Sequence, residues 1–280
     1  MSRRVAVITG AGSGIGRALA LACGQRGMAV VAADIEEQSL RQTQQLLQAQ
    51  GAVCHVQVCD VASEAQVQAL ADASWSACGR VDWLFNNAGV AVLGPVWQAT
   101  PDDWAWVLGV NLMGVVHGVR AFVPRILQAG APAHVVNTAS ASGLATLAGS
   151  GVYCASKHAV VALSECLQHD LRAAGAPIGV SVLCPSLLTT GIADSGRNRQ
   201  PQWARTVDPA PAYYERVRRG MADSPITAAD AATATLQAID RGSFYVMPHG
   251  HTWASVERRM RAIGEDHQRG MAAKEDHDER

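Results

Sequence analysis

Tyr153 and Lys157 lie four positions apart in Tyr-Cys-Ala-Ser-Lys, and Ser140 lies thirteen residues before Tyr153. The segment has the pattern of a helix start, so positions i and i+4 share a face and the Lys157 ammonium can approach the Tyr153 ring. A free tyrosine has a pKa near ~10, and a nearby positive charge favours the phenolate. Ser140 would donate a hydrogen bond to a carbonyl or alcohol oxygen. These residue types predict acid/base chemistry at a carbon–oxygen bond.

A glycine-rich segment near the N-terminus predicts a binding site for a pyrophosphate. An apolar, β-branched run at 4–9 leads into Gly10-Ala11-Gly12-Ser13-Gly14-Ile15-Gly16, and an Ala- and Leu-rich helical pattern follows at 15–26. Glycine permits positive φ and close approach of the backbone to an anion, while the free N–H groups of the first helical turn point at the phosphates. A flexible surface loop is the alternative, which the flanking strand and helix disfavour.

Short apolar runs alternate with longer helical patterns along most of the chain. The predicted strands cover 4–9, 29–33, 53–59, 81–86, 134–139, 178–184 and 243–247. The predicted helices cover 15–26, 36–50, 63–78, 101–129 and 152–174. Such alternation indicates a parallel sheet with helices on both faces and right-handed crossovers. We therefore predict an α/β fold with one seven-stranded parallel sheet.

The motifs together resemble those of the short-chain dehydrogenase/reductase family. Thr9-Gly10-x-x-x-Gly14-x-Gly16, Asn86-Asn87-Ala88-Gly89, Asn111, Ser140 and Tyr153-x-x-x-Lys157 occur in the family's order and at its separations, over about residues 4–190. The resemblance implies a doubly wound Rossmann sheet, a nicotinamide cofactor, and hydride transfer between that cofactor and a carbonyl or alcohol. One departure is Cys184-Pro185-Ser186, where the family usually has Pro-Gly, and it leaves the local turn open.

The resemblance also implies roles for the site residues. Tyr153 would be the acid/base, Lys157 would lower its pKa and hydrogen-bond the nicotinamide ribose, and Ser140 would hold the substrate oxygen. Asn111 would anchor a water that links Lys157 to solvent. Ser142 competes with Ser140, and only the spacing to Tyr153 favours Ser140. The residues expected to contact the cofactor are Gly10, Ser13, Gly14, Ile15, Gly16, Asp34, Asp60, Val61, Asn87, Ala88, Gly89, Tyr153, Lys157, Pro185 and Thr190.

Asp34 ends the second predicted strand, eighteen residues after Gly16. A carboxylate at this place in a dinucleotide-binding fold accepts hydrogen bonds from the adenosine ribose hydroxyls and repels a 2′-phosphate. Ile35-Glu36-Glu37 follow, which adds negative charge and no Arg or Lys. The alternative is a carboxylate that caps the next helix. We therefore predict NAD as the cofactor rather than NADP.

Substrate choice is expected at 186–225, because ligands of such sheets bind beyond the carboxyl ends of the strands. This stretch has an irregular pattern, so we expect a lid over the nicotinamide. The aromatic and apolar residues expected near the substrate are Trp203, Tyr213, Tyr214 and Met221 in the lid and Leu93, Leu144, Leu147 and Leu187 as a wall. They favour a moderately bulky, apolar secondary alcohol or ketone.

Composition argues against several other classes of protein. There are 23 Lys and Arg against 24 Asp and Glu, for a net charge of -1, so no field attracts nucleic acid or an anionic membrane. The seven cysteines are odd in number and show no paired spacing, which indicates a reducing compartment rather than a disulfide framework. Met-Ser-Arg-Arg leads straight into a strand, and no apolar run reads as a membrane span, so a cytoplasmic protein is expected. Metal-binding patterns are missing, so no metal is expected.

Residues 1–263 are predicted to form one dinucleotide-binding and catalytic domain, and 264–280 a charged, solvated, partly mobile tail. The helices at 101–129 and 152–174 carry more apolar residues than one sheet face obviously covers, namely Trp104, Trp106, Leu163 and Leu167 among others. The family pairs these helices between subunits, which implies a homodimer or homotetramer with an isologous interface. The alternatives left open are an NADP-dependent carbonyl reductase, a related epimerase or enoyl reductase, and a catalytically silent dinucleotide sensor.

Overall fold

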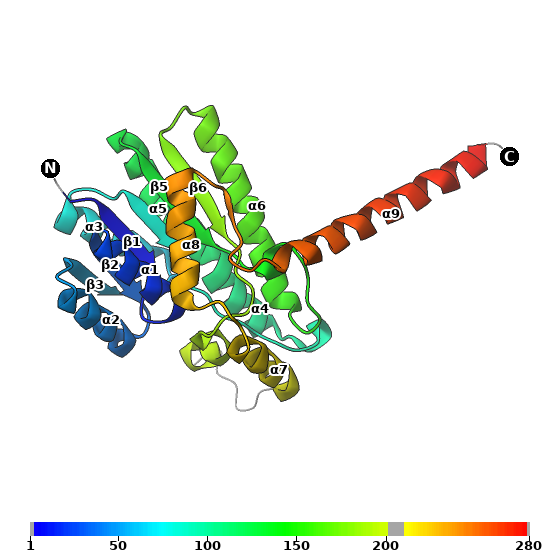
Figure 1. Ribbon diagram of the computed structural model, residues 1–280, viewed down its shortest axis with the longest axis horizontal. Helices are drawn as coiled ribbons and strands as arrows, with labels where there is room; N and C mark the ends of the chain where they lie inside the picture. The colour runs from blue at the N-terminus through cyan, green and yellow to red at the C-terminus, as the bar shows by residue number, and fades with distance from the viewer. Residues whose placement is uncertain (1–2, 201–209, 279–280) are drawn as a thin grey trace.

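The computed structural model of the chain describes residues 3–200 and 210–278. Seven parallel strands form one sheet in the order β3-β2-β1-β4-β5-β6-β7 (Figure 1). The strands are β1 (Val5–Thr9), β2 (Ala29–Asp34), β3 (Cys54–Val58), β4 (Trp83–Asn86), β5 (Ala133–Thr138), β6 (Ile178–Leu183) and β7 (Tyr245–Val246). The order reverses between β1 and β4, and this switch point is where a doubly wound sheet opens a crevice for ligands.

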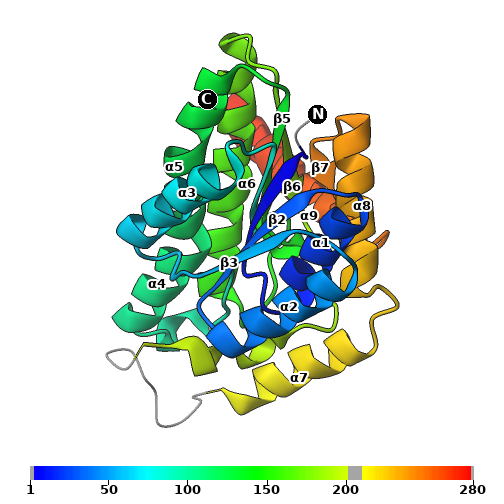
Figure 2. The same cartoon turned by 90° about the vertical axis from the view of Figure 1, so that its left-hand side faces the viewer.

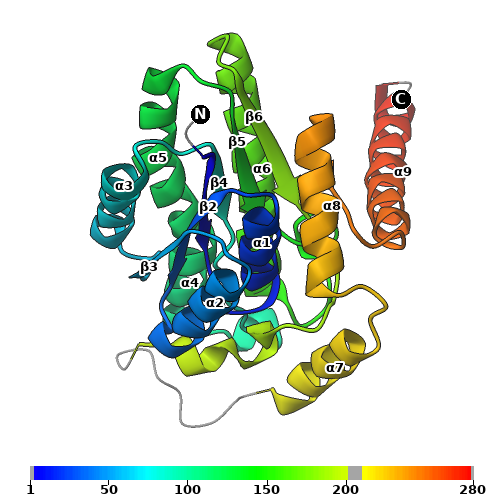
Figure 3. The same cartoon turned by 60° about the vertical axis from the view of Figure 1, so that its left-hand side comes forward.

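Helices cover both faces of the sheet, as the alternating pattern predicted (Figure 3). On one face, α1 (Gly14–Gln25) packs against β1 and β2, α2 (Glu37–Ala49) against β2 and β3, and α8 (Ala228–Arg241) against β6 and β7. On the other, α3 (Glu64–Cys78), α5 (Gly114–Ala129) and α6 (Gly151–Ala173) form the second core. Because both faces are covered, β1 is buried along its whole length and reads as an uninterrupted apolar run.

The helix predicted over 101–129 is not regular. It comprises α4 (Pro101–Leu108), a π-helical segment, η2 (Gly109–Met113), and α5. Among the described residues, 101–129 is the one helical stretch long and apolar enough to cross a membrane. By length and composition, the expectation that no apolar run could span a membrane was therefore wrong. Val107, Val115 and Phe122 of this stretch are buried in the core clusters, as in a core helix of a folded domain.

The chain after β6 is more helical than predicted. The short 3₁₀ turn η4 (Gly191–Asn198) follows β6, whereas the turns η1 (Val96–Gln98) and η3 (Ala141–Gly143) precede it. The expectation of an irregular stretch at 186–225 was wrong for η4 and for α7 (Pro211–Ala222), which lies across the carboxyl ends of the strands (Figure 2). Trp203 lies outside the described residues.

The last helix, α9 (Thr252–Asp278), extends away from the body of the molecule (Figure 1). The predicted tail at 264–280 is therefore helical as far as Asp278, and its residues up to Met271 are exposed. Regular helix formed here because the charged tail contains many good helix formers and no proline. The solvation expected of the tail agrees with this exposure.

Two residues offered as surplus apolar surface are already buried in the monomer. Trp106 of α4 is buried, and Leu167 of α6 packs in the core on the sheet. Trp104 and Leu163 are partly buried against the same helices. These side chains therefore serve the core, and the expectation of a homodimer or homotetramer stays a prediction.

Candidate active site

The glycine-rich turn connects β1 to α1 and brings two backbone segments unusually close. Gly10 has φ of 65° and Gly14 has φ of 50°, both in the left-handed region that favours glycine. A Cβ at Gly16 would lie 2.0 Å from the Gly10 carbonyl oxygen, so only glycine fits there. Ser13 precedes α1 in an extended conformation and makes no side-chain cap. The turn therefore leaves room for an anion in front of the helix N-terminus.

The end of β1 is tied to the end of β4 across the switch point. Thr9 Oγ1 accepts hydrogen bonds from the backbone N–H groups of Asn87 at 2.9 Å and Ala88 at 3.2 Å. The Asn87 amide donates in turn to the Thr9 carbonyl at 3.0 Å. These bonds hold the segment Asn87-Ala88-Gly89 beside the glycine-rich turn, where the sequence predicted a cofactor contact.

Asp34, at the end of β2, accepts hydrogen bonds with both carboxylate oxygens. Its Oδ2 accepts from the Gly12 N–H at 2.7 Å, and its Oδ1 accepts from the Glu36 N–H at 2.9 Å. Burial raises the pKa of this carboxyl, while these backbone bonds oppose the rise. The helix-capping alternative is not found, since Glu36 is the N-cap of α2 and Asp34 accepts from the N–H of Glu36 rather than from the first helical turn. A carboxylate has about four acceptor sites, so two local bonds leave capacity for ligand hydroxyls.

Asp60 and Val61 follow β3 and lie at the same edge of the sheet. Asp60 Oδ1 accepts from the Ala62 N–H at 3.0 Å, and its Oδ2 accepts from the side-chain amide of Gln200. The Val61 carbonyl faces Nδ1 of His117 at 2.9 Å. Both residues line the cavity described below.

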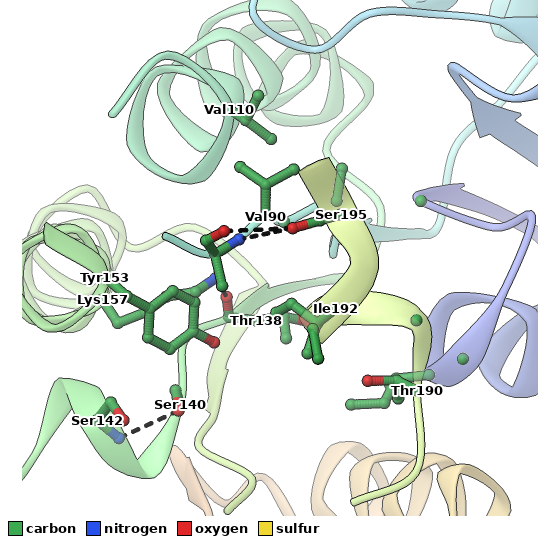
Figure 4. A pocket seen from close by; sticks show the side chains of 18 of the residues that line it. Val90, Val110, Thr138, Ser140, Ser142, Tyr153, Lys157, Thr190, Ile192 and Ser195 are labelled. Atoms are coloured by element: carbon green, nitrogen blue, oxygen red, sulfur yellow. Dashed lines mark hydrogen bonds between the residues drawn. The ribbon is translucent and has the colours of Figure 1, made fainter. Parts of the chain in front are cut away.

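Lys157 and Tyr153 project from the first turns of α6 toward the end of β5 (Figure 4). Lys157 is buried, donates to the Thr138 carbonyl at 2.8 Å, and has its Nζ 5.8 Å from the centre of the Tyr153 ring. The Ser140 hydroxyl donates to the Pro185 carbonyl at 3.3 Å and accepts from the Ser142 N–H at 3.1 Å. Of the two competing serines, Ser140 is the one whose hydroxyl interacts with Tyr153.

The titration of this pair differs from the expectation. Burial raises the pKa of Tyr153 to about 12, which the contact with Ser140 only partly offsets. Burial lowers the pKa of Lys157 to about 8. Burial is therefore the dominant effect on both groups, and the Tyr153 pKa lies above its ordinary value, where the sequence predicted a lowered one. Tyr153 is consequently a proton donor at neutral pH unless further positive charge enters the site.

Asn111 is fully buried in the π-helical segment η2. Its Oδ1 accepts from the Val90 N–H at 2.8 Å, and its Nδ2 donates to the Val90 carbonyl and to Ser156 Oγ, both at 3.0 Å. Ser156 in turn donates to the Tyr153 carbonyl at 2.7 Å. The side-chain amide thus clamps the chain after β4 to α6. The water that the resemblance implies between Asn111 and Lys157 stays a prediction.

Two predicted contacts come from the chain after β6. The Pro185 carbonyl accepts from the Ala141 N–H at 2.8 Å. Thr190 packs against the glycine-rich turn, where a Cβ at Gly14 would lie 2.9 Å from the Thr190 methyl group. The turn that the Pro-Ser departure left open is held by the Ser186 N–H, which donates to Nδ1 of His249 at 3.2 Å.

One cavity of about 430 Å³ gathers these groups. Of the predicted cofactor and catalytic residues, Gly16 and Asn111 stand behind its wall and all others line it. Of the predicted substrate residues, Leu93, Leu147, Leu187 and Met221 line it. Leu144 instead packs in a core cluster. Tyr214 lies outside, where its hydroxyl accepts from the Leu93 N–H at 3.2 Å, so it supports the wall without forming it.

Several cavity residues were missed by the sequence reasoning. Ser195 Oγ accepts from the Ala91 N–H at 3.0 Å, and Arg197 pairs with Glu36 at 2.8 Å, so η4 crosses the cavity from the chain after β4 to the start of α2. His251, Thr252 and Ser255 also line it. Their partners are distant in the chain, and no local motif marks them. Among the described residues no three His, Cys, Asp or Glu side chains form a metal site.

Comparison with known proteins agrees with this geometry. Residues 4–201 match the family described as short chain dehydrogenase. The chain therefore belongs to the short-chain dehydrogenase/reductase family, and it is an oxidoreductase with the doubly wound fold of that family.

A crystal structure of a short chain dehydrogenase/reductase from Burkholderia phymatum in complex with NAD is similar to this chain, with a TM-score of 0.93, 46% identity and coverage of 95% of both chains. A 1-deoxy-11-beta-hydroxypentalenate dehydrogenase of Streptomyces avermitilis is 39% identical over 86% of this chain and 83% of its own. A CLA biosynthesis dehydrogenase/reductase of Lactiplantibacillus plantarum is 31% identical over 94% of each.

Proposed function

We propose that this oxidoreductase moves a hydride between NAD(H) and a moderately bulky, apolar secondary alcohol or ketone. The observation that carries the proposal is the meeting of Ser140, Tyr153 and Lys157 with the glycine-rich turn in one cavity. A catalytically silent sensor would need the glycine-rich turn to bind the dinucleotide, but it would not need Lys157. Burial of this charged side chain costs free energy of folding. We therefore favour an enzyme over a dinucleotide sensor.

The groups that would hold the cofactor fit a dinucleotide. Gly10, Gly14 and Gly16 leave a cradle in which an added Cβ would clash, and the N-terminus of α1 faces it. Asp34 and Glu36 put negative charge at the adenosine end, which disfavours a 2′-phosphate. The NAD named for the similar crystal structure agrees with this choice. NADP stays the alternative, because Arg197 lines the same part of the cavity, although it is paired with Glu36.

The chain's own groups would then act on the substrate oxygen. A bound nicotinamide supplies or accepts the hydride. In reduction, Tyr153 donates its hydroxyl proton to the substrate oxygen, and Ser140 donates a hydrogen bond that strengthens as charge gathers there. In oxidation, Tyr153 must first lose its proton, and its raised pKa opposes this. Lys157, held by the Thr138 carbonyl, would keep a positive charge beside the phenol and the ribose.

The apolar wall supports the substrate class. Leu93, Leu147, Leu187, Val217 and Met221 contribute aliphatic surface to the cavity. The two curated relatives are named as dehydrogenases or reductases, and one is named for a hydroxylated compound. We also propose a cytoplasmic location and a homodimer or homotetramer. Light scattering that gives the monomer mass of 29.4 kDa would contradict the proposed oligomer.

The proposal is tested by following absorbance of the reduced nicotinamide with a panel of secondary alcohols and ketones of graded size. We expect turnover of the bulky apolar members and a higher kcat/KM with NAD than with NADP. A preference for NADP would refute the cofactor assignment, and activity confined to small polar hydroxy acids would refute the substrate class. Cofactor binding without any turnover would favour the silent sensor.

A further inference from the structure

The beginning of α9 forms one end of the cavity. His251, Thr252 and Ser255 line it, and Thr252 is the first residue of this 27-residue helix. The first N–H groups of a helix have no partner within the helix, and they carry the positive end of its dipole. The first turn contains no acidic residue that would cancel this field.

The Thr252 hydroxyl is an unusual group in this wall. The side chain is 2% exposed, and within the described part of the chain its Oγ1 has no hydrogen-bond partner. An unpaired buried hydroxyl is unfavourable, so native structures rarely keep one without a ligand or water. Buried threonines elsewhere are paired, as in Thr235, whose hydroxyl donates to the Ala231 carbonyl at 2.7 Å.

The surroundings hold this end of the cavity in place. His249 is buried, its Nδ1 accepts from the Ser186 N–H at 3.2 Å, and its Nε2 lies 3.0 Å from the Leu187 carbonyl. His251 Nε2 lies 3.1 Å from Ser186 Oγ. The loop after β6 and the start of α9 are therefore joined by direct bonds, so Thr252 is supported by a fixed frame.

Charge near this end is consistent with an anion. The one acidic side chain in the second turn of α9, Glu257, is engaged by the Trp253 indole at 2.6 Å. Arg259, also in the second turn, donates to the Leu144 carbonyl at 3.2 Å. Between this end and Tyr153 the cavity wall includes the aliphatic side chains of Leu147 and Leu187. The cavity thus offers a reacting group, an apolar wall, and a second polar group.

We propose that the beginning of α9 binds a carboxylate carried by the substrate, with the Thr252 hydroxyl and the backbone N–H groups that follow Thr252 in the first turn as donors. His251 and Ser255 lie beside it. The Thr252 N–H itself donates to the His249 carbonyl at 3.1 Å. A carboxylate only accepts hydrogen bonds, and it gains from the helix dipole, which a neutral hydroxyl or ester does not to the same degree. The substrate of the proposed function is then an apolar oxo or hydroxy acid. This inference rests on the proposed function only for the ketone or alcohol group that reacts at Tyr153, and not for the carboxylate.

The test compares Thr252→Val with the wild-type full-length chain. The probes are a decanoic acid chain that carries a ketone beside its terminal methyl group, and the methyl ester of the same acid. We expect the wild type to prefer the acid, and Thr252→Val to raise KM for the acid about tenfold while changing KM for the ester less than about twofold. Because kcat depends on Tyr153, it should change little for either probe.

Two variants separate binding from structure. Thr252→Ser keeps the hydroxyl and should retain the preference for the acid. Thr235→Val removes a buried hydroxyl that is paired, so it should lower the melting temperature without changing the ratio of KM values. Thr252→Val removes an unpaired one, so its melting temperature should not fall. A fall in melting temperature with equal loss for acid and ester would assign Thr252 a structural role and overturn the proposal.

Binding of decanoate to the enzyme–NADH complex, measured by calorimetry, keeps the test independent of turnover. We expect saturable binding that Thr252→Val weakens about tenfold. No binding, or equal binding by both proteins, would overturn the carboxylate site. If no ketone is reduced and decanoate still binds through Thr252, the proposed function fails and the carboxylate site stands. If neutral ketones are reduced with no preference for the acid, the carboxylate site fails and the proposed function stands.

Discussion

The chain up to β6 and the chain after it are organised by different forces. In the first region, the groups of the site follow the ends of paired strands, and side chain–backbone hydrogen bonds such as those of Thr9 with Asn87 tie these strand ends together. In the second, the cavity wall is held by side-chain contacts over long sequence separations, such as Arg199 with Asp103 and Ser195 with Ala91. The family match itself ends at residue 201.

The difference teaches where chemistry and selectivity reside. A parallel sheet with short crossovers places Ser140, Tyr153 and Lys157 by a repeated backbone plan that many substrates can share. The segment after β6 is joined to that plan by side-chain contacts rather than by strand pairing, so substitutions within it can change the cavity while the sheet stays in place. We therefore expect mutations in the first region to remove turnover, and mutations in the second to change stability of the segment or choice of substrate.

The largest effect should come from Tyr153→Phe, which tests whether the chemistry belongs to the first region. The change removes the proton donor and leaves the ring in its place, so kcat should fall by about 10²–10⁴. Binding of NADH, followed by its fluorescence, should stay within about twofold, since the glycine-rich turn is untouched. A variant with wild-type kcat would remove Tyr153 from the acid/base role.

A smaller effect is expected from Arg199→Met, which tests how the second region is fastened. Arg199 pairs with Asp103 at 2.5 Å and lies over the Trp106 ring at 4.3 Å, with both charged side chains buried. Loss of one buried partner leaves a buried charge and should lower the free energy of unfolding by about 3–5 kcal/mol in urea titration.

Arg218→Met is the matched control for this change. Arg218 pairs with Asp194 of the same segment at 2.7 Å, and both side chains are about half exposed, at 50% and 58%. Loss of an exposed pair should lower the free energy of unfolding by less than about 1 kcal/mol. Equal losses for the two variants would contradict the view that buried long-range pairs hold this segment.

A gain in stability of roughly 1–3 kcal/mol is expected from Lys157→Met, because relief of the lowered pKa outweighs the lost hydrogen bond to the Thr138 carbonyl, and it tests whether the site is built at the expense of stability. Burial lowers the pKa of Lys157 from 10.5 to about 8, so the charged form is disfavoured in the folded state. Below pH 8 the variant should therefore be more stable than the wild type. Between pH 8 and 10.5 the unfolded wild type binds the extra proton, its stability rises with pH, and the advantage should fade. A variant that is less stable at pH 6 would refute this.

The parts that the sequence predicted are those with local physical signals. Glycine-rich turns, apolar strands and the spacing of Tyr153 and Lys157 act within a few residues, and all seven predicted strands and the single parallel sheet are confirmed. Even α8 has a local mark that was overlooked, a capping box of Thr227 and Asp230. The π-helical turn at Asn111 has no comparable mark, because its amide is positioned by Val90 and Ser156.

The walls of the cavity could not be predicted in the same way. Gln200 contacts Asp60 across 140 positions, and Thr252 lines the cavity three residues after His249, which is bonded to the loop after β6. The raised pKa of Tyr153 also depends on burial that only the folded chain creates. Such features follow from tertiary packing, which a pattern of residue types does not encode locally.

The central claim is that hydrogen moves directly between a substrate carbon and the nicotinamide in this cavity. It is tested most directly with a secondary alcohol deuterated at its carbinol carbon, incubated with the protein and NAD in ordinary water, and followed by NMR of the reduced cofactor. The account predicts deuterium at C4 of the dihydronicotinamide. Reduced cofactor that carries only solvent hydrogen at C4 would contradict it.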